Sequence, residues 1–186
     1  LSAAHVFVEA LARDLDARRL AVLSPDAGGV KRAARFRELL AERVEGEIPF
    51  GFVEKHRSDG QVVPGRLVGD VRGRLCVIVD DLVSSGRTLA HAAAAAREAG
   101  AEGVIAVVTH GLFTGTADAR LRAAPLDRLY VMDTVPPFRL SPETFATGKV
   151  RVLDASPLLA DVVRRLYAGD EVEPLTEARS EERRVG

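Results

Sequence analysis

The sequence predicts an α/β domain with a doubly wound, mostly parallel sheet and helices on both faces. Short apolar segments alternate with amphipathic ones along the 186 residues, as expected for a fold built from βα units. The clearest strand, Leu75–Val79, is apolar throughout, which is typical of a strand covered on both faces. Hydrophobic residues make up 47% and charged residues 28%, which indicates a globular chain and not a disordered one.

The elements of the first half follow from apolar periodicity and from the positions of glycine and proline. Apolar residues recur near the 3.6-residue period in the first segment, and Gly28-Gly29 opens the second helix. Residues 57–66 are polar and contain Gly and Pro, so we expect a long loop or a loose hairpin there. The elements expected before this loop are a helix at 4–17, a strand at 20–23, a helix at 30–43 and a strand at 48–53.

The second half continues the same alternation. Gly100 is suited to end an Ala-rich helix, and Ser156-Pro157 is suited to begin the last helix. Residues 171–186 are charged and lack periodicity, so we expect one domain over 1–170 and a disordered tail. The elements expected after Leu75–Val79 are a helix at 89–99, a strand at 104–108, a helix at 117–122, strands at 129–132 and 150–153, and a helix at 156–167.

Composition narrows the classes of function. With 26 Lys and Arg against 27 Asp and Glu, the formal net charge is −1, so nothing in it favours binding to nucleic acid or to a membrane surface. No apolar run approaches the roughly 20 residues of a membrane span. The single cysteine, Cys76, excludes an intramolecular disulfide and a cysteine-clustered zinc site. We interpret it as a buried thiol of a cytoplasmic protein.

An acid pair followed by a hydroxyl-rich loop is the first candidate site. Asp80 and Asp81 follow the buried strand, and two adjacent acids there are costly unless they face solvent, a metal or a polyol. The loop presents backbone N–H groups and hydroxyls to an anion at the start of a helix. A strand-to-helix turn capped by a serine is the structural alternative. The combination favours a sugar phosphate, with the loop residues Ser84, Ser85, Gly86, Arg87 and Thr88 on the phosphate.

Two more polar segments follow predicted strands, where ligands of open α/β sheets bind. Asp26 and the glycines after it follow the strand at 20–23, and Lys55-His56-Arg57 begins the loop after the strand at 48–53. Transfer of a phosphoryl or diphosphoryl group needs cations on a segment that can close over the developing charge, and a loop with Gly60 and Gly65 can do this. A solvated basic turn is the structural alternative for the second segment.

These motifs resemble a known family. The segment Val77–Leu89 looks like the phosphoribosyl diphosphate (PRPP) signature of type I phosphoribosyltransferase folds, and Ser24–Ala33 resembles the diphosphate loop of ribose-phosphate diphosphokinases, the PRPP synthetases. The segments 109–115, 133–136 and 156–169 are also similar to that family. The resemblance covers about residues 1–175 and corresponds to the family's C-terminal half. Because Leu1 is not a methionine, we expect a piece of a longer synthetase in preference to a stand-alone domain.

The resemblance implies the transfer of the β,γ-diphosphate of Mg-ATP to O1 of ribose 5-phosphate, which gives PRPP and AMP. It implies ATP and ribose 5-phosphate as partners, Mg²⁺ as cofactor, and a homo-oligomer, either a hexamer or a dimer. It assigns the loop cations Lys55 and Arg57 to catalysis and makes Asp26 a metal ligand. The implied ribose 5-phosphate residues are Asp80, Asp81, Ser84, Ser85, Gly86, Arg87 and Thr88, and the implied diphosphate residues are Asp26, Ala27, Gly28 and Gly29.

The sequence departs from the family pattern at three of these positions. Ser85 replaces Thr, Arg87 replaces Gly, and His56 replaces the middle Arg of the loop triplet. Two other functions stay open. One is a PRPP-consuming phosphoribosyltransferase, which needs a base-stacking aromatic such as Phe113 or Phe138. The other is a non-catalytic regulatory subunit, which loss of the acids or of the loop lysine would have favoured.

Overall fold

A seven-stranded sheet organises the described part of the chain. The computed structural model describes residues 1–14, 19–54, 56–58, 61–63 and 65–172. Its strands are β1 (Leu20–Ser24), β2 (Phe50–Val53), β3 (His56–Ser58), β4 (Gln61–Val63), β5 (Leu67–Val68), β6 (Leu75–Val83), β7 (Gly103–Gly111), β8 (Arg128–Met132) and β9 (Val150–Leu153). Its helices are α1 (Ala4–Asp14), the 3₁₀ turn η1 (Ala27–Gly29), α2 (Val30–Ala41), α3 (Arg87–Glu98), α4 (Ala117–Ala123), α5 (Pro142–Ala146) and α6 (Ser156–Ala168).

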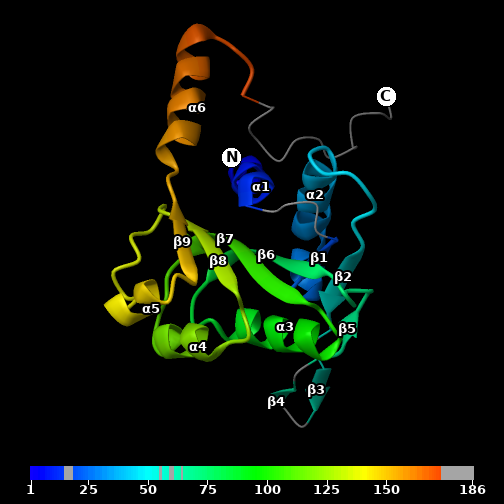
Figure 1. The fold of residues 1–186 in the computed structure, drawn as a ribbon. Coiled ribbons are helices and arrows are strands. Elements are labelled where there is room, and N and C mark those ends of the chain that lie inside the picture. The colour runs from blue at the N-terminus through cyan, green and yellow to red at the C-terminus, as the bar shows by residue number, and fades with distance from the viewer. Residues whose placement is uncertain (15–18, 55, 59–60, 64, 173–186) are drawn as a thin grey trace.

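The sheet has the strand order β5-β2-β1-β6-β7-β8-β9. Every pairing in it is parallel except that of β5 with β2. Figure 1 shows α1 and α2 on one face and α3 and α4 on the other. The doubly wound, mostly parallel sheet expected from the sequence is therefore confirmed.

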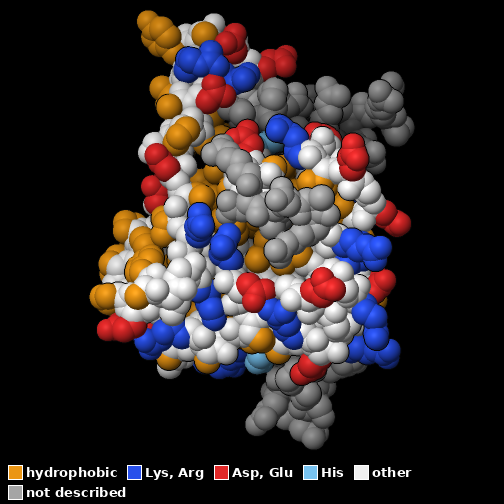
Figure 2. Space-filling view, in the orientation of Figure 1, with side chains coloured by type: hydrophobic (Ala, Val, Ile, Leu, Met, Phe, Trp, Pro, Cys, Tyr) orange, Lys and Arg blue, Asp and Glu red, His pale blue; other side chains and the backbone are white. Residues whose placement is uncertain are grey.

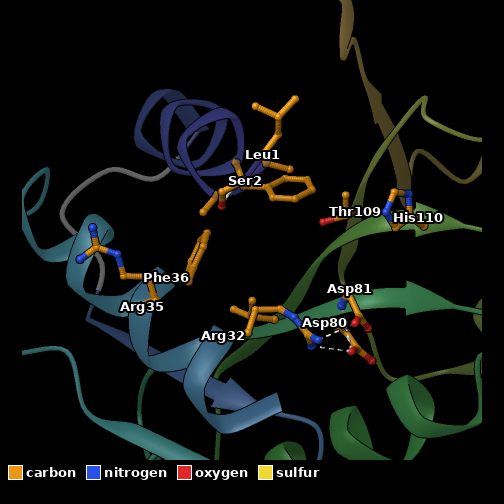
Figure 3. Close-up of a pocket in the computed structure, with 13 residues that line it drawn as sticks. Leu1, Ser2, Arg32, Arg35, Phe36, Asp80, Asp81, Thr109 and His110 are labelled. Atoms are coloured by element: carbon orange, nitrogen blue, oxygen red, sulfur yellow. Dashed lines mark hydrogen bonds and ion pairs between the residues drawn. The ribbon is translucent and has the colours of Figure 1, made fainter. Parts of the chain in front are cut away.

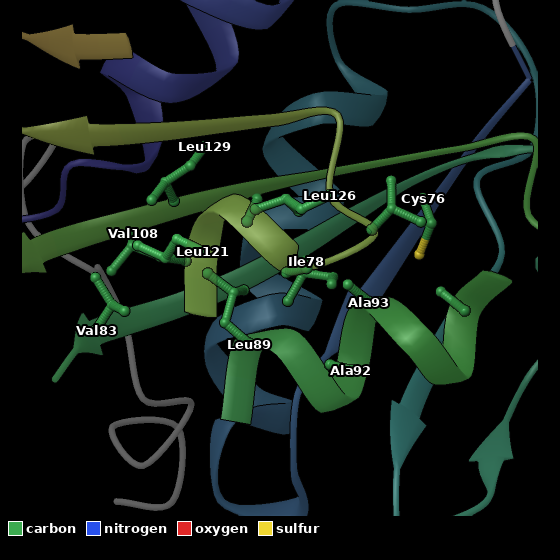
Figure 4. Packing of buried hydrophobic residues seen from close by; sticks show 14 of the residues in the cluster. Cys76, Ile78, Val83, Leu89, Ala92, Ala93, Val108, Leu121, Leu126 and Leu129 are labelled. Atoms are coloured by element: carbon green, nitrogen blue, oxygen red, sulfur yellow. The ribbon is translucent and has the colours of Figure 1, made fainter. Parts of the chain in front are cut away.

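Alternate residues of β6 pack into two separate cores. Cys76 and Ile78 belong to the core under α3 and α4, and Val77 and Val79 belong to the core under α1 and α2. Figure 4 shows the first core, where small alanines of α3 lie against the strands. Cys76 is fully buried, and burial raises the pKa of its thiol to about 12, as suits a packing residue.

Some element boundaries differ from the expected ones. The central strands are longer than predicted, because β6 continues past its apolar segment to Val83 and β7 runs beside it to Gly111. The helix α5 and the short strand β5 were missed. The segment expected as a loop or loose hairpin contains β3 and β4, which pair in an antiparallel hairpin. Residues 173–186, most of the expected tail, lie outside the described residues.

The last helix, α6, extends away from the sheet in Figure 1. It has no buried residue, and its apolar side chains Leu159, Val163, Leu166 and Tyr167 are exposed. Figure 2 shows this helix carrying hydrophobic side chains beside charged ones. No helix in the described ranges is both long enough and apolar enough to cross a membrane.

Candidate functional site

The carboxyl ends of β1 and β6 bring the acid pair and the glycine loop together. These strands are neighbours and run parallel, so their carboxyl ends lie at one edge of the sheet. Asp80 and Asp81 lie in the last four residues of β6, toward this edge, and η1 follows β1 at the same edge. Two of the three segments singled out from the sequence therefore meet in the fold.

Arg32 bridges the two acids. From the first turn of α2 its Nη1 lies 3.2 Å from Asp80 Oδ1, and its Nη2 lies 2.5 Å from Asp81 Oδ2. Figure 3 shows the guanidinium reaching from α2 to both carboxylates on β6. The side chain of Asp80 is 18% exposed and that of Asp81 is 56% exposed. The positive charge of Arg32 thus compensates two adjacent negative charges, one of which is mostly removed from water.

The environment of Asp80 opposes its ionised form. Burial raises the pKa of this carboxyl from 3.8 to about 6. The backbone N–H of Asp81 donates to Asp80 Oδ1 over 2.9 Å and acts in the opposite direction, as does the charge of Arg32. The neighbouring carboxylate of Asp81 adds to the increase. A ligand that donates hydrogen bonds or brings positive charge would stabilise the ionised form of this carboxyl.

The diphosphate-loop segment forms a tight turn around Asp26. The carboxylate of Asp26 caps η1 by accepting the N–H of Gly29 at 3.1 Å, and the buried hydroxyl of Ser24 donates to the carbonyl of Asp26 at 2.6 Å. A Cβ at Gly29 would lie 2.7 Å from Ser24 Oγ, so only glycine fits this turn. Because Gly28 also lacks a side chain, a ligand can approach the backbone closely here.

The second segment, the Ser84–Thr88 loop, runs from the end of β6 into the first turn of α3. Gly86 has φ +71°, a left-handed conformation that glycine adopts without strain, and α3 begins at the next residue. Asp80 and the loop residues Ser84 to Thr88 line a cavity of about 180 Å³. Hydroxyls and the N–H groups at the start of a 12-residue helix make this cavity suitable for an anion.

The segment after β7 holds the Ser84–Thr88 loop in place. The hydroxyls of Ser84 and Thr114 lie 2.8 Å apart, and the N–H of Thr114 donates to the carbonyl of Ser84 at 2.9 Å. Arg120 of α4 donates to the carbonyl of Ser85. These bonds hold the loop in place, which reduces the entropy cost of binding a ligand there.

A second cavity of about 250 Å³ adjoins the acid pair on the side of α1 and α2. Figure 3 shows Arg32, Asp80 and Asp81 on one side of it and Thr109 and His110 on another. His110 Nδ1 lies 2.9 Å from the hydroxyl of Thr134. Because Asp80 lines both cavities, the acid pair lies between two spaces that a single extended ligand could occupy.

The third segment leaves the sheet at this same edge, because β2 runs parallel to β1 and pairs its Phe52 with Ser24. Lys55 lies outside the described residues. Arg57 is part of β3, and the hairpin of β3 and β4 projects from the body of the domain in Figure 1. The catalytic assignment of these two residues therefore stays a prediction.

Sequence reasoning missed three residues of the site: Arg32, Thr114 and Arg120. Arg32 could have been found, because it lies three residues after Gly29, within the first turn of the helix that the glycines open. Thr114 and Arg120 reach the loop from a later βα unit. Nothing in the local sequence pattern indicates that contact.

Known proteins resemble this chain over most of its length. The model of the family described as "Phosphoribosyl synthetase-associated domain" matches residues 50–176. A ribose-phosphate pyrophosphokinase of Pasteurella multocida is 40% identical over 162 residues, which are 87% of this chain and 49% of the relative. A ribose-phosphate pyrophosphokinase of Vibrio cholerae is 42% identical over 160 residues, which are 84% of this chain and 48% of the relative. The chain thus spans about half the length of the curated relatives that it matches.

The fold agrees with the sequence comparison. The crystal structure of phosphoribosylpyrophosphate synthetase from Mycobacterium smegmatis matches with a TM-score of 0.76 and 30% identity. The match covers 90% of this chain and 51% of that one. Since the family model covers well over half of the residues, the chain belongs to the phosphoribosyl synthetase-associated domain family.

Proposed function

We propose that this chain is the ribose-phosphate-binding part of a ribose-phosphate diphosphokinase. The observation that carries the proposal is the meeting of an acid pair and two anion-binding loops at one edge of the sheet. Such a site can hold a sugar by its hydroxyls and phosphate groups on both sides of it. Relatives named ribose-phosphate pyrophosphokinase, similar over more than four fifths of the chain, support it.

Each segment has a proposed role. Asp80 and Asp81 accept hydrogen bonds from the ribose 2- and 3-hydroxyls, and the Ser84–Thr88 loop binds the 5-phosphate in its cavity of about 180 Å³. The turn from Asp26 to Gly29 presents backbone N–H groups to the diphosphate. Lys55 and Arg57 neutralise the charge that develops during transfer. Arg87, where the family has glycine, adds a positive charge beside the 5-phosphate loop.

In the proposed reaction the protein positions the two substrates and neutralises the charge on their phosphates. The O1 hydroxyl of ribose 5-phosphate attacks the β-phosphorus of ATP. A bond from O1 to phosphorus forms, the bond from that phosphorus to the bridging oxygen of AMP breaks, and the hydroxyl proton passes to solvent. The loops hold the O1 hydroxyl in line with the β-phosphorus and its leaving oxygen, so the reacting groups are already oriented when the transfer begins.

The donor atoms present suit Mg²⁺, which prefers carboxylate oxygens and keeps several waters. No cluster of three or more His, Cys, Asp or Glu side chains exists among the described residues, so the protein alone does not complete a cage. Asp26 would hold the ion together with phosphate oxygens, and Asp80 and Asp81 could hold one beside the sugar. The bound ion would neutralise phosphate charge.

The protein's location and assembly are part of the proposal. The composition and the single buried cysteine support a cytoplasmic location. The family resemblance supports a homo-oligomer.

The rival enzyme, a phosphoribosyltransferase, needs an aromatic side chain to stack on a base. Phe113 cannot serve, because it is 2% exposed and packs in the core under α3 and α4. Phe138 is 71% exposed, with the guanidinium of Arg139 lying 4.4 Å from its ring centre. This ring keeps the transferase as an alternative, which the following experiment separates from the kinase.

Phosphorus NMR of the purified chain with Mg-ATP and ribose 5-phosphate tests the proposal. Matching resonances of PRPP and AMP would establish a diphosphokinase. Broadening of the ribose 5-phosphate line without turnover would show a sugar-phosphate site that needs another polypeptide for ATP. If neither occurs, the proposed site is wrong, and the non-catalytic subunit becomes the better reading.

Asp81→Asn tests the ribose role directly. Losing a charge-assisted hydrogen bond to a hydroxyl should weaken ribose 5-phosphate binding by about 1 to 3 kcal/mol, measured by isothermal titration. Asp127→Asn is the control, because Asp127, just before β8, is also exposed and is also paired with an arginine, Arg97 of α3. An unchanged dissociation constant in Asp81→Asn would remove the acid pair from the ribose site.

A further inference from the structure

Arg32 lies between the acid pair and the glycine turn, and its guanidinium is hydrogen-bonded to the acid pair. Its guanidinium bonds to both carboxylates of the acid pair, and its side chain is 30% exposed. A Cβ built on Gly29 would lie 3.4 Å from Arg32 Nη1, so the guanidinium also lies against the glycine turn. The side chain can therefore reach an anion at Gly28-Gly29 by changing rotamers, with α2 in place.

The present partners of Arg32 compete with the proposed ligand. Asp80 Oδ1 and Asp81 Oδ2 accept from the guanidinium, and the same oxygens are the acceptors available to sugar hydroxyls or to a cation. A cation at the acid pair repels the guanidinium, and an anion at the glycine turn attracts it. Both changes move Arg32 in the same direction, from the acids toward the turn.

We propose that Arg32 exchanges partners during binding and so couples the two subsites. In the structure it neutralises Asp80 and Asp81. When the ribose hydroxyls take the acids, the guanidinium turns to the diphosphate at the glycine turn. The inference rests on the proposed function, because it takes a ribose phosphate and a diphosphate as the two occupants.

Exchange of one cation between two subsites makes each ligand improve the binding of the other. Displacing Arg32 from the acids costs free energy, and the ligand that binds first offsets this cost. The second ligand then binds without it, because Arg32 has already moved. The coupling must be the same in both directions. Without Arg32 two anionic ligands should repel each other, and the coupling should vanish or reverse.

Isothermal titration measures this coupling without turnover. Ribose 5-phosphate is titrated into the full chain at fixed Mg²⁺, with and without saturating inorganic diphosphate. We expect diphosphate to tighten ribose 5-phosphate binding on the order of tenfold, within the usual range for coupled sites. The reverse titration should give the same factor.

Arg32→Gln separates coupling from structural support. In this variant we expect the coupling factor to fall to about one or below, as its cause is removed. Ribose 5-phosphate alone should bind at least as tightly as to the parent chain, because no guanidinium competes for the acids. Arg32→Lys should restore part of the coupling, since an ammonium carries the charge but cannot bridge two carboxylates by a planar fork.

Arg35→Gln is the matched control. Arg35 lies one turn further along α2, lines the same cavity and pairs with Glu38 at 2.9 Å. This variant should keep the parent's coupling. Thermal unfolding followed by circular dichroism confirms that each variant is folded.

The outcomes are distinct. A parent chain that binds both ligands without coupling overturns the exchange and leaves the proposed function standing. An Arg32→Gln variant that loses affinity for both ligands equally also overturns it, because Arg32 would then merely hold the site together. A parent chain that binds neither ligand refutes the proposed function itself.

Discussion

Replacing Asp80 with asparagine should change the free energy of unfolding, relative to the parent chain, in a way that depends on pH. The difference should favour the variant more at neutral pH than at acid pH. The carboxyl of Asp80 has its pKa raised from 3.8 to about 6, first of all by burial. An acid with a raised pKa contributes stability below its unfolded pKa and loses that contribution as the pH rises through its folded pKa. Asparagine has nearly the same shape and never ionises, so it avoids this loss.

The size of the effect follows from the pKa. A change from 3.8 to about 6 corresponds to about 3 kcal/mol between the protonated and ionised forms. The free energy of unfolding of Asp80→Asn, minus that of the parent chain, should therefore grow by about 2 to 3 kcal/mol between about pH 4 and pH 7.5. Most of the growth should occur below about pH 6, and the difference should level off above that.

Urea denaturation at a series of pH values measures this difference, provided that the slope against urea concentration is unchanged. Glu45→Gln, which removes an exposed carboxyl in the loop after α2, is the control variant. A constant or shrinking difference for Asp80→Asn would refute the conclusion that the fold opposes ionisation at this position. The variant that is favoured as the pH rises should also bind ribose 5-phosphate more weakly, because residues of a functional site often lower stability.

Three further predictions concern packing, backbone and the loop. Val77→Ala should lower the free energy of unfolding in urea by about 2 kcal/mol, because Val77 is fully buried. Val163→Ala on the exposed α6 should change it by less than about 0.5 kcal/mol. Equal losses in the two variants would show that α6 is covered. Gly69→Ala should cost about 3 kcal/mol, since φ is +125° and the new Cβ would lie 2.7 Å from a backbone carbon of β2. Gly46→Ala, with φ +100° and nothing within 4 Å, should cost only about 1 kcal/mol, and similar melting temperatures would contradict the crowding. Lys55→Ala should lower kcat far more than affinity for ribose 5-phosphate in steady-state assays, and equal losses in both would indicate a binding role.

The order and type of the main elements could be predicted because local signals were strong. The apolar strand at Leu75–Val79 and the alternation around it specify a parallel sheet covered on both faces. The strand β9 was predicted with its observed bounds, Val150–Leu153. By contrast, α5 is a single short turn of helix whose start is fixed by Ser141 accepting the N–H of Thr144, a signal as common in loops as in helices.

The length of β6 could not be predicted, because its last four residues are placed by a neighbouring strand. Asp80 pairs with Val108, Leu82 with His110 and Val83 with Gly111 of β7. Two acids and an exposed leucine look like the end of a strand when only the local sequence is read. The pairing with β7 continues the strand regardless, which leaves Asp80 mostly buried and the following loop pressed against the segment after β7.

The same limitation explains why the acid pair was found and the cation beside it was not. Two adjacent acids after an apolar strand are conspicuous, because burying them has a cost that something must offset. The sequence alone points to a ligand for that role, whereas the fold places Arg32 there, 48 residues before Asp80 in the chain. A site that supplies its own cation must release that cation before a ligand can use the acids. The cost of binding ribose therefore depends on where Arg32 can go next, and the glycine turn beside it is the nearest place where an anion would hold it.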